Sequence, residues 1–159
     1  MIEDYAMELE KEGELFYRHL SERAPHPGLI KIFSWLAEEE VKHYFVFKKM
    51  KEGSVSEFSP NDILLSAKDL FKSLVEDKSF DFGENQVVLY RDAQKIEKKS
   101  KDFYLKTAES EGDLQKKTIL LKIAEEEEKH FFLLEKIIGF VSRPQSWLEN
   151  AEFNQLKEY

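Results

Sequence analysis

Two copies of a Glu-x-x-His motif carry the residue types that most plainly suggest chemistry in this sequence. They are Glu40-Val41-Lys42-His43 and Glu127-Glu128-Lys129-His130. Residues three apart lie on the same face of a helix, so each motif presents a carboxylate beside an imidazole. Both groups bind iron, manganese and similar divalent ions. The chain contains no Cys, which excludes thiolate ligands, disulfides and iron–sulfur clusters.

Two further carboxylates, Glu10 and Glu97, extend this pattern. Each is followed seven residues later by a tyrosine, Tyr17 and Tyr104. Every residue in the first half of the set recurs 87 positions later in the second half. The sequence therefore predicts a duplicated helical hairpin, with two halves packed around an approximate two-fold axis.

The segments that must position these residues have the apolar periodicity of helices. Apolar residues recur at three- and four-residue spacing in 2–22, 29–51, 85–110 and 114–139. The predicted stripes are Ile2, Tyr5, Ala6, Leu9, Phe16 and Leu20; Leu29, Ile32, Phe33, Leu36, Ala37, Phe47 and Met50; Val88, Leu89, Ala93, Ile96, Phe103 and Ala108; and Leu120, Leu121, Ile123, Ala124, Phe131, Leu134, Ile137 and Ile138. We therefore expect an all-α chain of four long helices.

Turn signals group these helices into two hairpins, about 2–51 and 85–139, joined by a long connection over 54–83. That connection holds Ser59-Pro60 as a helix start, followed by Ile63, Leu64, Leu65, Ala67, Leu70, Phe71 and Leu74, and reads as a short crossover helix. A short C-terminal helix is expected over about 144–157, after Pro144. One long crossover between two hairpins is the connectivity of ferritin-like four-helix bundles. We predict a single ferritin-like domain over 1–159.

The four carboxylates fall among the apolar residues of their helices, which predicts that they point into the bundle. Buried, unpaired carboxylates cost several kcal/mol each, so four of them need compensating charge or protonation. Two divalent cations would supply +4 against −4, and two neutral imidazoles would complete their coordination. This is the ligand pattern of carboxylate-bridged dinuclear sites. The metal ligands predicted from the sequence are Glu10, Glu40, His43, Glu97, Glu127 and His130.

These motifs resemble those of the rubrerythrin-like (erythrin) branch of the ferritin-like di-iron carboxylate proteins, over roughly residues 3–140. By that resemblance Glu10 and Glu97 are similar to the carboxylate ligands of the first and third helices. Glu40 and Glu127 look like bridging carboxylates. His43 and His130 look like terminal nitrogen ligands. Tyr17 and Tyr104 would lie beside the metals and hydrogen-bond the bridging carboxylates, a supporting role.

The resemblance implies two iron ions, with manganese or a mixed pair left open, and an oxidoreductase acting on peroxide or dioxygen. The alternative is an iron-binding, ferroxidase-type protein without a dedicated substrate. Full-length rubrerythrins carry a rubredoxin with Cys-ligated iron, so a chain without Cys implies a separate electron-donor protein. The family often forms homodimers. The sequence departs from rubrerythrins proper at Ser100, where they have a further Glu; its repeat counterpart is Gly13.

Composition excludes other classes of function. With 32 acidic and 24 basic residues the formal charge is −8, the wrong sign for a protein that neutralises nucleic-acid phosphates. No apolar run approaches the roughly 20 residues of a membrane span, and the acidic start is no signal peptide. We therefore expect a cytoplasmic protein with neither nucleic-acid nor membrane partners.

The remaining charged groups near the motifs are expected to be solvated. Glu38-Glu39 and Glu125-Glu126 flank the predicted ligands at a different helical phase, with Lys42 and Lys129 four residues after Glu38 and Glu125. They predict exposed faces with i,i+4 ion pairs. His19 and His26 lie outside the motifs and are likewise expected in solvent.

Overall fold

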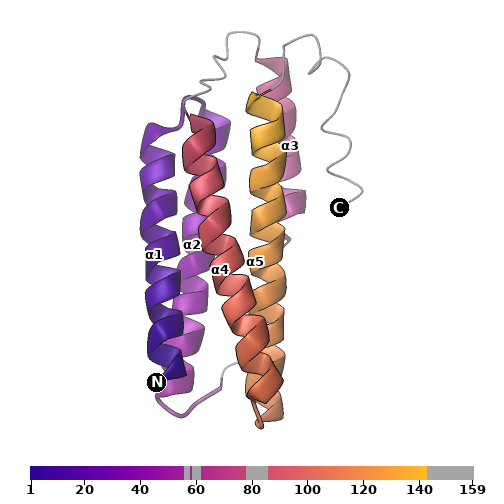
Figure 1. Ribbon diagram of the computed structural model, residues 1–159. Helices are drawn as coiled ribbons and strands as arrows, with labels where there is room; N and C mark the ends of the chain where they lie inside the picture. The colour runs from indigo at the N-terminus through magenta and orange to yellow at the C-terminus, as the bar shows by residue number, and fades with distance from the viewer. Residues whose placement is uncertain (56–57, 59–61, 78–85, 143–159) are drawn as a thin grey trace.

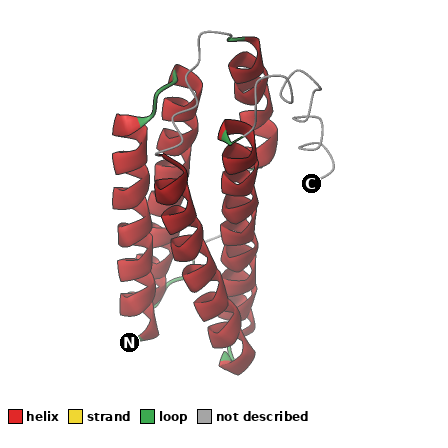
Figure 2. Cartoon of the chain, turned by 45° about the horizontal axis from the view of Figure 1, so that its top comes forward, coloured by secondary structure: helices red, strands yellow, loops and turns green. Residues whose placement is uncertain are grey.

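The computed structural model describes residues 1–55, 58, 62–77 and 86–142. Within these residues the chain forms helices and no strand (Figure 2). The helices are α1 (Ile2–Arg23), α2 (Pro27–Lys51), α3 (Ile63–Glu76), α4 (Val87–Ser110) and α5 (Leu114–Val141). The sequence predicted the four long helices to within two residues at each end, and it predicted a crossover helix in the connection that holds α3. The predicted C-terminal helix over 144–157 and the predicted start at Ser59-Pro60 lie outside the described residues.

The four long helices form two antiparallel hairpins, α1 with α2 and α4 with α5, which meet mainly through α1 and α4 (Figure 1). The crossover returns the chain to the opposite end of the bundle, so α2 and α4 run in the same direction. Helix α3 lies on this return path and packs against α2 and α5. The prediction of an all-α ferritin-like bundle is confirmed.

Side-chain caps and one glycine explain where several helices begin or end. Asp62 caps α3 by accepting a hydrogen bond from Leu65 N at 3.1 Å. Asp113 caps α5 by accepting hydrogen bonds from the first-turn amides of Gln115 and Lys116. After α2, Gly53 adopts φ +91°, a conformation that strains residues with a side chain. These local signals set the helix limits independently of the core.

The apolar core is divided into two clusters at opposite ends of the long helices. One contains Tyr17, Leu29, Phe33, Leu36, Phe71, Tyr90 and Ile137 among others. The other contains Ala6, Leu9, Phe47, Met50, Tyr104, Ala108 and Ile123 among others. The predicted polar ligands fall between these clusters in the sequence of every long helix. The predicted stripes were wrong for five residues that are exposed, namely Ile2, Tyr5, Leu65, Val88 and Leu121. These residues lie at the outer edges of their stripes, which the neighbouring helices do not cover.

His26 was expected in solvent, and that prediction is wrong. Its side chain is buried and forms the N-cap of α2, where Nδ1 accepts a hydrogen bond from Gly28 N at 2.9 Å. A neutral imidazole that accepts at Nδ1 carries its proton on Nε2. Nε2 therefore donates to Asp77 Oδ2 at 3.0 Å. His26 thus joins the start of α2 to the residue that ends α3.

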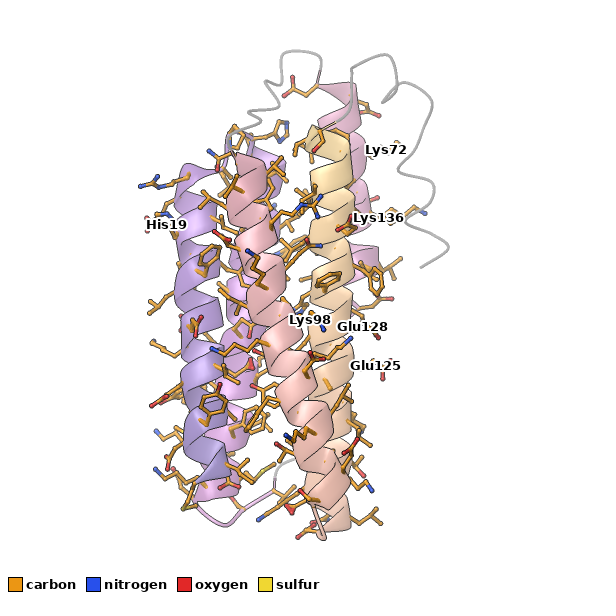
Figure 3. All side chains as sticks on the ribbon, in the orientation of Figure 1. His19, Lys72, Lys98, Glu125, Glu128 and Lys136 are labelled. Carbon is orange, nitrogen blue, oxygen red and sulfur yellow. The ribbon has the colours of Figure 1, made fainter. Side chains whose placement is uncertain are left out.

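We expect His26→Ala to lower the stability of the fold by about 1–3 kcal/mol, since it removes an N-cap and a tie between two helices. The melting temperature should fall by roughly 3–10 °C. The matched control is His19→Ala, because His19 lies on the outer side of α1 (Figure 3) and should leave the melting temperature unchanged. Equal melting temperatures for the two variants would contradict the capping role.

No helix among the described residues is long and apolar enough to span a membrane.

Candidate metal centre

The six predicted ligands come together between the two apolar clusters. Glu10 lies on α1, Glu40 and His43 on α2, Glu97 on α4, and Glu127 and His130 on α5. All six side chains are buried, none more than 2 % exposed. Each helix places its polar residues there because they share a face with the apolar residues on either side.

The six residues form two overlapping groups of potential metal ligands. Glu10, Glu40, His43 and Glu127 form one group, and the other exchanges Glu10 and His43 for Glu97 and His130. In each group one ligand atom per residue lies within 4.8 Å of the others. Glu40 and Glu127 belong to both groups, which is the position of bridging carboxylates in a dinuclear site.

The two imidazoles are nearly parallel and face the carboxylates through Nδ1. Their ring centroids are 6.1 Å apart at an interplanar angle of 13°. His43 Nδ1 lies 2.9 Å from both Glu10 Oε1 and Glu127 Oε1. His130 Nδ1 lies 3.4 Å from Glu40 Oε1 and from Glu97 Oε1. Each Nδ1 thus faces two carboxylates of its own ligand group.

The two tyrosines connect the hairpins beside this cluster. Tyr17 on α1 donates to Glu97 Oε1 on α4, and Tyr104 on α4 donates to Glu10 Oε2 on α1, each at 2.5 Å. The expectation that they hydrogen-bond Glu40 and Glu127 was wrong. The phenols reach across the contact between α1 and α4 instead, because each tyrosine and its carboxylate partner lie on opposite sides of that contact. These two hydrogen bonds hold Glu97 and Glu10 in place.

Burial and mutual repulsion shape the protonation of the cluster. Desolvation, together with the negative charges of Glu10 and Glu97, raises the pKa of Glu40 and of Glu127 well above the usual range, and the charge of Glu127 adds to the rise at Glu40. Burial disfavours a charged His43, but Glu10, Glu126 and Glu127 outweigh it and raise the His43 pKa. Burial also acts against ionised Glu97, yet His130 lowers its pKa to about 2. Without metal, the centre retains protons to limit its charge.

The donor set fits divalent metal ions. Among the described residues, four buried atoms of the cluster make no hydrogen bond: Glu40 Oε1, Glu97 Oε2, Glu127 Oε1 and His130 Nδ1. Buried polar atoms are normally satisfied, and each one left without a partner costs about 1–3 kcal/mol. Metal coordination would satisfy all four atoms and neutralise the carboxylates at the same time.

A family model described as Rubrerythrin matches residues 4–138. The chain belongs to the rubrerythrin family. The match spans all six predicted ligands and both tyrosines. Neither a search of curated proteins nor one of solved structures found a match.

Of the two equivalent positions Ser100 and Gly13, Gly13 contacts the centre directly. Ser100 is buried on α4, and its repeat counterpart Gly13 is buried on α1. A Cβ built on Gly13 would lie 3.2 Å from Glu40 Cδ and Oε2, a tight approach. Because Gly13 has no side chain, α1 leaves enough space for the Glu40 carboxylate.

Two buried acids beside the centre were missed by the sequence interpretation. Glu39 and Glu126 were expected in solvent but are buried, whereas Glu38 and Glu125 are exposed as expected. Lys42 pairs with Glu39 at 3.5 Å rather than with Glu38. The signal that could have found them is the repeat itself, because Glu39 and Glu126 are equivalent positions 87 residues apart.

Proposed function

We propose that this protein is a di-iron carboxylate oxidoreductase that reduces peroxide or reacts with dioxygen. The observation that carries the proposal is the pair of overlapping ligand groups that share Glu40 and Glu127. Carboxylate and imidazole donors suit iron or manganese, and membership of the rubrerythrin family favours iron. A separate electron-donor protein and a homodimeric assembly belong to this proposal.

One ion would be held by the first ligand group, Glu10, Glu40, His43 and Glu127. The other ion would be held by the second group, Glu40, Glu97, Glu127 and His130. When bound, two ferrous ions would supply two electrons, which with two protons would reduce one hydrogen peroxide molecule to two water molecules.

The surrounding residues keep this donor set in place. Glu126 Oε1 lies 2.7 Å from His43 Nε2, so a proton held at Nε2 leaves the Nδ1 lone pair free for a metal. Tyr17 and Tyr104 orient Glu97 and Glu10. The Phe58 ring lies edge-on to the His43 ring at 5.6 Å. Together with the two apolar clusters, it limits access of water to the centre.

The alternative is a metal-handling protein of ferroxidase type without a dedicated substrate. The observation in its favour is Ser100, which stands where rubrerythrins proper have a further carboxylate. In this case the same six ligands would bind and oxidise iron, and the iron itself would be the substrate.

The test is anaerobic loading with ferrous iron followed by peroxide in rapid mixing. We expect two iron ions per chain, an oxo-bridged diferric absorption spectrum and one peroxide consumed per two irons oxidised. Repeated turnover with a reduced rubredoxin, supplied as a separate protein, supports the oxidoreductase. Oxidation of added iron without peroxidase turnover supports the alternative. Failure to bind iron would contradict both functions.

A further inference from the structure

A second group of potential ligands lies on the far side of His43 from the dinuclear centre. It consists of Glu39 on α2, Glu126 on α5 and His43 itself, with one ligand atom from each within 4.8 Å of the others. Glu126 accepts from His43 Nε2, whereas the dinuclear centre faces Nδ1. The imidazole of His43 therefore separates the two groups.

The Glu39 carboxylate is incompletely satisfied for a buried group. The residue is 6 % exposed, and its Oε2 is buried without a hydrogen-bond partner. Among the described residues it makes one ion pair, with Lys42 Nζ at 3.5 Å, and the Lys42 side chain is half exposed. A lysine in this position can swing into solvent at little cost. The Glu39 carboxylate is thus available to another cation.

Glu39 also lines an open pocket of about 430 Å³ between α2 and the start of α3. The same pocket is lined by Glu38, Lys42 and Asp62. It therefore presents three carboxylates against one ammonium group. Such a concave acidic surface raises the local concentration of cations. Since Glu39 belongs both to the pocket and to the group around His43, it connects solvent with the neighbourhood of the dinuclear centre.

We propose that Glu39 and Glu126 form a third divalent-cation site, through which cations pass from the acidic pocket to the dinuclear centre. The proposal rests on the proposed function, because it assigns an entry route to the metal site described above. The two carboxylates would supply oxygen ligands, and water from the pocket would complete the coordination. With one ammonium group competing for Glu39, this site binds more weakly than the two-metal centre.

Manganous ion provides the test, because free and bound Mn²⁺ differ in their electron paramagnetic resonance signal. Its binding can therefore be followed without an oxidation step. The full chain is titrated anaerobically, and filling of the centre is followed by rapid mixing. We expect wild type to bind two tight and one weaker Mn²⁺. Glu39→Gln should lose the weaker ion, retain the two tight ones and fill about tenfold more slowly.

Two further variants make the comparison specific. Glu125→Gln removes an equal charge from the exposed face of α5 (Figure 3) and should match wild type in both stoichiometry and rate. Lys42→Gln removes the competing ammonium group and should tighten the weaker site. Circular dichroism melting curves confirm that each variant is folded.

Wild type that binds two Mn²⁺ and no third would overturn this inference while leaving the proposed function intact. A Glu39→Gln variant that still binds three Mn²⁺ and fills at the wild-type rate would also overturn it. Wild type that binds no Mn²⁺ and no Fe²⁺ would overturn the proposed function as well.

Discussion

Replacing Glu127 with Gln will abolish tight metal binding at both positions of the centre, whereas replacing Glu10 with Gln will abolish it at only one. Glu127 belongs to both ligand groups, and Glu10 belongs to one. A neutral amide offers a weaker oxygen donor and removes one of the four charges that balance two divalent ions. The expected stoichiometry is two Mn²⁺ or Fe²⁺ per chain in wild type, one in Glu10→Gln and none in Glu127→Gln.

The measurement is anaerobic calorimetric titration combined with elemental analysis after gel filtration. Glu125→Gln is the control, because it makes the same chemical change two residues away on the exposed side of α5. Any third, weaker ion is removed during gel filtration and does not enter the count. One metal retained in Glu127→Gln, as in Glu10→Gln, would show that Glu127 does not bridge.

Removing the metals will make the stability of the protein fall as pH rises from about 5 to 8. In the metal-free protein the pKa values of Glu40 and Glu127 are raised. The folded state therefore binds more protons than the unfolded state above the ordinary carboxyl pKa of about 4.3, and stability falls with pH. His43 acts in the same direction, since its raised pKa contributes stability that is lost as pH rises through the folded value.

Glu97 has the opposite effect, but outside this interval. Its folded pKa of about 2 contributes stability above the ordinary carboxyl value, and that stability is lost only as pH falls toward 2. The metal-free protein should therefore be more stable near pH 5 than near pH 8.

Metal binding should reverse this trend, because the ligands must lose their protons to bind and binding strengthens as pH rises. With free metal at 100 times the dissociation constant, each site adds about 2.7 kcal/mol, so two sites should raise the melting temperature near pH 8 by roughly 10 °C or more. Paired melting curves in chelator and in Mn²⁺ at pH 5, 6.5 and 8 provide the measurement. A metal-induced rise in melting temperature that is the same at all three pH values would contradict the predicted coupling between protonation and metal binding.

Much of the fold followed from local patterns. The 3.6-residue periodicity predicted the helices, turn signals grouped them into two hairpins, and the 87-residue repeat indicated that one hairpin duplicates the other. The edges of the apolar stripes were not predictable in the same way. Val88 and Leu121 share the spacing of core residues but are exposed, because the width of a buried face depends on how closely the neighbouring helix approaches.

The sequence alone was enough to predict the six candidate ligands, since four carboxylates and two imidazoles recur in register on otherwise apolar helical faces. The hydrogen bonds that support these residues depend on how the helices pack and were not predictable from the sequence. Tyr17 reaches Glu97 and Tyr104 reaches Glu10, across an interface between helices far apart in the chain. The structure likewise decided that Glu39 is buried and Glu38 exposed. Periodicity reveals one apolar face per helix, but α2 packs against α1, α3 and α5, and a polar residue on a second covered face has no periodic signal.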